Sequence, residues 1–101
     1  TAEDLVKLVM AASKYPTIVN ASGKNSVKVE TTKKKFLEFH NTNSLVNRGY
    51  HFFVSKTGWI TKSGGCIVMM MDTANGIRTV VLLGSKNTKT RIPEAKMLAM
   101  L

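Results

Sequence analysis

The chain opens with a helical pattern of apolar and polar residues. In residues 1–15, four apolar side chains recur at the spacing of one helical face: Leu5, Leu8, Val9 and Ala12. Thr1 and Asp4 resemble a capping box that starts this helix. Pro16 ends it, because a proline pushes the preceding residue out of helical geometry. We expect a short turn and then a loop over residues 17–25.

A hairpin is predicted next. Residues 26–30 alternate between polar and apolar side chains, and residues 36–40 form a second short strand. The lysine-containing run 31–35 between them is expected to turn the chain. Three short polar side chains in residues 41–46 can bond their own backbone, which favours an ordered loop over a helix there.

The second half of the chain predicts a three-stranded meander. The strands are expected over residues 50–60, 66–71 and 77–83. The middle strand is a continuous apolar run, as is typical of a strand that is covered on both faces. Asn75-Gly76 is a strong signal for a hairpin turn. A closing helix is predicted over residues 92–101, with Pro93 in its first turn.

This order of elements predicts an α+β fold, an antiparallel β-meander flanked by helices. We expect the first and last helices to cover one face of the meander. The apolar middle strand needs cover on its second face as well, and this chain supplies little for it. We therefore expect the domain to extend beyond residues 1–101.

The chain is strongly basic, and such a charge balance often marks a polyanion partner. Lys and Arg number 15 against 6 Asp and Glu, which gives a formal net charge of +9. The basic residues are spread out, apart from the run 33–35, and the sequence has neither zinc-finger spacing nor the aromatic pattern of an RNA-binding sheet. We expect a solvated surface and no nucleic-acid partner. A small basic module that binds a polyanion or the cell wall without catalysis is the alternative interpretation.

One tripeptide in the predicted strand 50–60 carries recognisable chemistry. Lys56 and Thr57 bring an ammonium and a hydroxyl, which together can bind a carboxylate. Gly58 leaves room for a peptide backbone to lie beside the strand. The structural alternatives are a surface lysine, a β-branched strand former and a bulge glycine. The arrangement suits an edge strand that receives an extended peptide with a carboxylate at its end.

The other reactive residue types favour structural roles. His40 and His51 have no nucleophile or carboxylate cluster beside them, so we expect neither a catalytic base nor a metal site. The single cysteine, Cys66, allows no internal disulfide, and we expect it to be a buried core residue like the methionines at 69–71. No cofactor and no membrane-spanning segment are expected.

Several segments, in this order, resemble the low-molecular-mass penicillin-binding proteins, which are serine D-alanyl-D-alanine carboxypeptidases and endopeptidases. They are Thr1–Leu5 with Tyr15-Pro16, His40–Leu45, Ser55–Trp59 with Ser63–Val68, and Arg91–Leu101. The resemblance covers nearly the whole chain and is nearest to the endopeptidase branch. It implies that residues 1–101 form the C-terminal portion of a β-lactamase-like, serine transpeptidase-like catalytic domain that carries the Lys-Thr-Gly motif.

The same resemblance implies an activity and its residues. The activity is that of a serine-type D-Ala-D-Ala peptidase, which acts on peptidoglycan stem peptides in the periplasm through an acyl-serine intermediate and binds β-lactam antibiotics. Lys56 is implied as a catalytic residue, and Thr57, Gly58 and Trp59 as substrate-binding residues. Trp59 is implied to offer a backbone N–H to an oxyanion hole, with a packed aromatic as its structural alternative.

Two of the three family motifs are missing from the chain. Ser-x-x-Lys does not occur, and Thr31-Thr-Lys-Lys34 keeps only its spacing, in a predicted turn. Ser85-Lys-Asn87 has the letters of Ser-x-Asn but follows Lys-Thr-Gly, whereas the family has this motif before it. We therefore expect the nucleophile in an N-terminal part of the domain and expect this segment alone to be inactive. A degenerate relative that binds wall peptide without cutting it is a third possibility.

Overall fold

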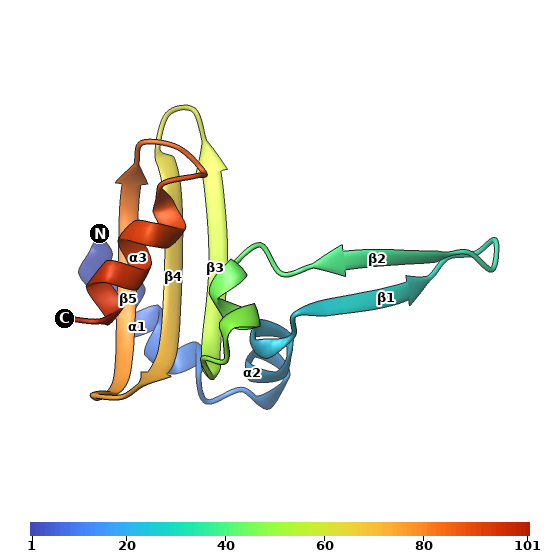
Figure 1. Cartoon of the computed structure of the whole chain (residues 1–101), viewed down its shortest axis with the longest axis horizontal. Coiled ribbons are helices and arrows are strands. Elements are labelled where there is room, and N and C mark those ends of the chain that lie inside the picture. The colour runs from blue at the N-terminus through green and yellow to red at the C-terminus, as the bar shows by residue number, and fades with distance from the viewer.

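A computed structural model describes the backbone of residues 1–101 and every side chain except that of Asn47. In chain order the elements are α1 (Ala2–Ala12), α2 (Pro16–Gly23), β1 (Ser26–Glu30), β2 (Phe36–His40), the 3-10 helix η1 (Ser44–Arg48), β3 (Phe52–Ile60), β4 (Gly64–Thr73), β5 (Gly76–Ser85) and α3 (Arg91–Ala99). Figure 1 shows the sheet of β3, β4 and β5, with helices on both sides and the β1–β2 hairpin extending away from it.

The strands form two separate antiparallel sheets. β1 pairs with β2, from Ser26 opposite His40 to Glu30 opposite Phe36. The longer strands form a meander in the order β3-β4-β5. The predicted hairpin is therefore confirmed with its boundaries. The predicted meander is confirmed as well, with strand ends displaced by one or two residues.

One face of the meander carries the hydrophobic core. Met69 and Met71 of β4 pack there with Leu45 of η1 and Ala95 of α3, and all four side chains are buried. Because side chains alternate along a strand, Met70 lies on the opposite face, where it is half-buried. The prediction that the methionine run fills the core therefore holds for Met69 and Met71.

The first and last helices lie on opposite faces of the meander, so the expectation that they cover one face was wrong (Figure 1). α3 packs on the core face against β4 and β5, whereas α1 contacts these strands from the other side and α2 contacts β3. The cover on the α1 side is incomplete. Val9 is buried, but Leu8 and Met10 remain exposed. The middle strand thus has one closed face and one face beside an open apolar groove.

The start of α1 follows the predicted local chemistry. The Thr1 hydroxyl accepts a hydrogen bond from the Asp4 backbone N–H at 3.3 Å and donates to the Asp4 carboxylate at 2.8 Å. Together with the N-cap backbone contact of Asp4, these bonds form the predicted capping box. The helix ends at Ala12 instead of Tyr15. Between it and Pro16, the backbone N–H groups of Lys14 and Tyr15 bond the carbonyl oxygens of Ala11 and Ala12 in two overlapping turns.

Two segments expected to be irregular contain helices. Pro16 begins α2 in addition to ending the preceding segment, because proline fits a first helical turn, where its missing N–H has no partner to lose. The helix runs to Gly23, so the expectation of a turn and loop over residues 17–25 was largely wrong. Part of the ordered loop expected over 41–46 is the 3-10 helix η1, which continues to Arg48.

The β1–β2 hairpin extends away from the rest of the molecule (Figure 1). Every residue of both strands is exposed. The molecule measures 45 × 31 × 25 Å, and its radius of gyration of 14.3 Å exceeds the roughly 13 Å of a compact domain of this length. The fold therefore consists of a meander packed against helices and an exposed β1–β2 hairpin that no other element covers.

Candidate functional site

The Lys-Thr-Gly run lies within an edge strand. Aromatic and β-branched residues, which favour extended structure, make up most of β3. β3 pairs with β4 on one side, and its other edge has no partner strand in the described backbone. Lys56 is opposite Val68, and Thr57 is opposite the core residue Ile67. The alternation of a strand therefore puts Lys56 on the α1 side and Thr57 on the α3 side, so the two flank the open edge.

A cavity of about 1180 Å³ opens on the α1 side of this strand. Its walls come from α1, α2, the base of the β1–β2 hairpin, β3 and β4, and Lys56, Thr57 and Gly58 are among its lining residues. Most of the wall is apolar, with side chains from each of these elements: Leu5, Val9, Ile18, Val27, Phe39, Val54 and Val68. The cavity thus combines a large apolar surface with one cationic, hydroxyl-bearing edge.

The polar groups at this edge retain free bonding capacity. The Lys56 ammonium donates to the Thr57 carbonyl oxygen at 2.5 Å, which uses one of its three donors. Among the described side chains, no carboxylate lies within ion-pair distance of Lys56. The Thr57 hydroxyl lies 2.6 Å from the hydroxyl of Thr42. If Thr42 donates in this pair, the Thr57 proton is available to a ligand.

Gly58 and Trp59 follow in regular strand geometry. Gly58 is opposite Cys66, and a Cβ at Gly58 would find no atom within 4 Å. The irregularity of β3 lies between Phe52 and Val54, so the bulge that was the structural alternative for Gly58 is not at this residue. The Trp59 side chain is 47% exposed and does not line the cavity. The packed aromatic that was its structural alternative is therefore only partly packed.

Arg91, a buried residue at the start of α3, was not among the predicted site residues. Its guanidinium Nη1 donates to the Gly58 carbonyl oxygen at 3.0 Å. Its Nε is buried without a hydrogen-bond partner among the described atoms. The arginine thus places a second positive charge beside the Lys-Thr-Gly strand. A separation of 33 residues from Gly58 leaves no local pattern that could have linked the two residues.

Two asparagines shape the segment that brings Thr42 to the site. The Asn41 side chain donates to the carbonyl oxygens of Ser22 and Lys24 at the end of α2. Asn43 is fully buried, donates to Ser55 of β3 at 3.0 Å and accepts from the Leu45 backbone N–H. Both residues therefore order this segment, as expected from the short polar side chains in residues 41–46.

The remaining reactive residues lie apart from this chemistry. His40 is exposed, 3.5 Å from the Glu38 carboxylate, and His51 makes an edge contact with Phe53. The prediction that Cys66 is a buried core residue was wrong, because it is only half-buried and lines the cavity opposite Gly58. The Ser85 hydroxyl lies 2.8 Å from that of Thr90 and donates to Glu94 within the fold.

The described residues contain no cluster of three or more His, Cys, Asp or Glu side chains placed to hold a metal ion. None of the described helices has both the length and the apolar character that a membrane crossing requires. The arrangement offers two cations and a hydroxyl around an open strand edge. Such an arrangement can bind a carboxylate and an extended peptide backbone.

Comparison with known proteins gives two curated relatives. The chain is 31% identical over 100 residues to a D-alanyl-D-alanine endopeptidase of Escherichia coli K12 and 29% identical over 100 residues to one of Pseudomonas aeruginosa. Each match covers 97% of this chain and 32% of the relative. The chain thus spans about a third of the length of these relatives. No protein-family model matches it.

Solved structures give the fold. Two variants of the Streptomyces K15 DD-transpeptidase superimpose with a TM-score of 0.83 over 97% of this chain and 40% of theirs, at 20% identity. The fold is therefore that of part of a DD-transpeptidase, and the predicted α+β, serine transpeptidase-like class is confirmed. Together with the curated relatives, it confirms the resemblance to a segment of the low-molecular-mass penicillin-binding proteins.

Proposed function

Since this chain is similar to part of a low-molecular-mass penicillin-binding protein, we propose that it is the C-terminal portion of a serine D-alanyl-D-alanine peptidase domain. The proposed substrates are peptidoglycan stem peptides that end in D-Ala-D-Ala, cleaved through an acyl-serine intermediate in the periplasm. β-Lactam antibiotics are proposed to acylate the same serine. The nucleophile belongs to a part of the domain outside residues 1–101.

The observation that carries this proposal is the position of Lys56, Thr57 and Gly58. They lie on an extended edge strand and line a cavity of about 1180 Å³. An extended peptide can add to such an edge by main-chain hydrogen bonds. Lys56 on one face and Thr57 on the other reach a carboxylate at the end of that peptide from both sides.

Gly58 gives independent support. Its backbone has no positive φ, and an added Cβ would meet nothing within 4 Å. Neither backbone conformation nor packing within this chain therefore requires a glycine there. A peptide lying along the strand does require it, because a side chain would hold the two backbones apart.

The incomplete cover of the α1 face supports the proposed missing part. The cavity wall is apolar on several elements, and Leu8 of α1 is exposed. A surface of this kind is costly in water. We propose that the N-terminal part of the domain covers this apolar surface. It would also bring Ser-x-x-Lys and Ser-x-Asn close to Lys56 of the third motif, Lys-Thr-Gly.

In this proposal each residue has a stated task. Lys56 supplies the positive pole that binds the substrate carboxylate and favours ionised forms of neighbouring groups. Thr57 donates to the same carboxylate. The Trp59 backbone N–H stabilises the oxyanion of the tetrahedral intermediate. Arg91 fixes the Gly58 carbonyl by a charge-assisted hydrogen bond and so holds the strand in position.

The first test uses the reading frame that encodes this chain. We expect codons upstream of Thr1 to specify Ser-x-x-Lys followed by Ser-x-Asn. The full-length product should be labelled covalently by a fluorescent penicillin. A Lys56→Gln variant should be labelled about 100-fold more slowly, since loss of one preorganised electrostatic contact typically costs a factor of this size.

Lys62→Gln is the matched control. Lys62 is an exposed lysine just beyond the end of the same strand, outside the residues that line the cavity. Its replacement should leave the labelling rate unchanged. An upstream sequence without the two motifs would remove the proposed chemistry. Equal labelling rates for wild type and Lys56→Gln would remove Lys56 from the site.

A further inference from the structure

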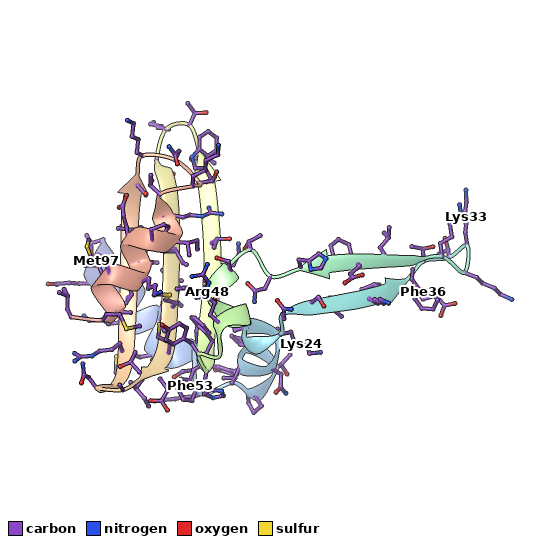
Figure 2. The ribbon with its side chains drawn as sticks, viewed as in Figure 1. Lys24, Lys33, Phe36, Arg48, Phe53 and Met97 are labelled. Carbon is purple, nitrogen blue, oxygen red and sulfur yellow. The ribbon has the colours of Figure 1, made fainter. Side chains whose placement is uncertain are left out.

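The far end of the β1–β2 hairpin is an apolar and basic tip without contacts to the body of the molecule. Figure 2 shows Lys33 and Phe36 at this end, whereas Lys24 lies near α2 at the base. The base takes part in the cavity wall through Val27 and Phe39. The tip, defined here as residues 29–37, extends beyond that wall.

Apolar side chains at the tip point to both faces of the hairpin. Val29 is opposite Leu37, so these two side chains share one face, and they are 46% and 52% exposed. The Phe36 side chain lies on the other face, together with that of Glu30, its partner across the hairpin, and Phe36 is 68% exposed. A flat protein surface could cover one of these faces but would leave the apolar side chain of the other face in water.

The turn of the hairpin adds positive charge to this apolar surface. Lys33, Lys34 and Lys35 are consecutive and exposed, and Lys34 has a positive φ of 56°. Among the described side chains, no carboxylate lies within ion-pair distance of these three lysines. The free ammonium groups therefore surround the end of an arm that carries exposed Phe, Leu and Val.

We propose that this tip binds an anionic lipid surface. An interface of lipid head groups and acyl chains can surround the end of a narrow hairpin and cover Phe36 and Leu37 on both faces at once. The three lysines then contact the anionic head groups, with their aliphatic stems along the apolar boundary. A soluble polyanion would pair with the lysines but would leave the apolar side chains exposed.

The geometry predicts where the rest of the molecule lies. Val27 and Phe39 of the cavity wall lie two residues from Val29 and Leu37 of the tip. With the tip in the head-group layer, the cavity wall therefore begins about 7 Å from the lipid surface. This attachment is independent of the proposed peptidase chemistry.

Vesicle sedimentation of the full 101-residue chain tests the proposal. Wild type should sediment with phosphatidylcholine vesicles that contain phosphatidylglycerol, and much less with phosphatidylcholine alone. Replacing all three lysines of the tip with Gln should weaken binding about 100-fold, because each lysine near an anionic surface contributes about equally to the binding free energy. Phe36→Ser should weaken it about 10-fold, because it removes the aromatic anchor.

Two controls separate the tip from the general charge of the chain. Ile77→Ser changes a similarly exposed apolar residue at the start of β5 (60% against 68% for Phe36), and Lys62→Gln removes an exposed lysine elsewhere. Both should bind as wild type does. In addition, Phe36→Trp should show a blue shift and quenching by brominated lipid when vesicles are added, whereas Ile77→Trp should show neither.

Three results would overturn the proposal. The first is the absence of sedimentation with anionic vesicles. The second is loss of binding in the lysine variant without any effect of Phe36→Ser, which indicates a soluble polyanion such as wall polymer or nucleic acid. The third is a Phe36→Trp fluorescence spectrum that does not change with lipid. Circular dichroism checks the fold of each variant, and the substituted residues are all exposed.

Discussion

The clearest residue-scale finding is the contrast between two glycines of the same strand pair. A Cβ at Gly58 would meet no atom within 4 Å, whereas a Cβ at Gly65 would lie 2.9 Å from the Asn87 carbonyl oxygen. Gly65 is thus required by packing within the chain. Gly58 has no such internal requirement, which fits a position reserved for a ligand.

This contrast leads to a prediction for Gly58→Ala. The free energy of unfolding of the chain should stay within about 0.5 kcal/mol of wild type, because the added methyl enters open space. In the full-length product, labelling by a fluorescent penicillin should fall at least about 10-fold, because the methyl separates the ligand from the strand. Urea denaturation and labelling kinetics measure the two effects.

Gly65→Ala is the comparison for that variant. It should lower the free energy of unfolding by about 1–3 kcal/mol, the usual range for overpacking, since its contact is a backbone atom. If Gly58→Ala instead lost stability as Gly65→Ala does, Gly58 would have a packing role. If it kept full labelling, Gly58 would have no role in substrate binding.

At the scale of elements, the hairpin is attached to the body through a few polar contacts at its base. The Asn41 side chain donates to the Ser22 and Lys24 carbonyl oxygens at 3.0 and 2.9 Å and accepts from the Asn43 backbone N–H. One side chain thereby joins the end of α2, the exit of β2 and the segment that carries Thr42. Such orphan carbonyl oxygens at a helix end need partners.

Replacement of Asn41 should therefore loosen this junction. Asn41→Ala should lower the free energy of unfolding by about 1–3 kcal/mol, since partly buried backbone groups lose their partners. Amide hydrogen exchange should become faster in β1, β2 and the end of α2 before it does in β4. Chemical denaturation and exchange mass spectrometry are the measurements.

The matched control is Asn25→Ala. Asn25 is exposed and contributes its backbone carbonyl oxygen, not its side chain, to the hydrogen bond with the Asn41 N–H. It should leave both stability and exchange unchanged. Equal behaviour of the two variants would show that the Asn41 side chain does not join these elements.

At the scale of the whole molecule, the two faces of the meander differ. The α3 face is closed by a continuous buried cluster that includes Leu45, Phe52 and Met69. The α1 face opens into the apolar cavity beside Lys56. The known structures with this fold are more than twice as long as the part that this chain matches. This difference in cover supports the proposal that a further part of the domain lies against the α1 face.

The isolated chain should accordingly bind no penicillin covalently. It has no Ser-x-x-Lys, so a fluorescent penicillin should leave the purified 101 residues unlabelled under conditions that label the full-length product. The apolar cavity should at the same time increase the fluorescence of a hydrophobic dye. Covalent labelling of the isolated chain would place a nucleophile within residues 1–101 and contradict the proposed division of the domain.

The sequence by itself determined the strands, the first and last helices and the likeness to the penicillin-binding proteins, but not α2 or η1. The β1–β2 hairpin, the meander and the capping box were predictable because alternation, turn residues and capping depend on neighbours within a few positions. The strand that carries Lys56 was predictable for the same reason. Helix boundaries near Pro16 were less so, since proline both ends one helix and begins another.

Only the tertiary structure decided which residues meet. The Arg91 contact with Gly58, the Thr42 contact with Thr57 and the half-buried state of Cys66 depend on how distant segments pack. The positions of α1 and α3 on opposite faces also follow from packing, because an apolar strand accepts a helix on either side. Local periodicity determines which face an element buries, but which segment packs against that face depends on residues far away in the sequence.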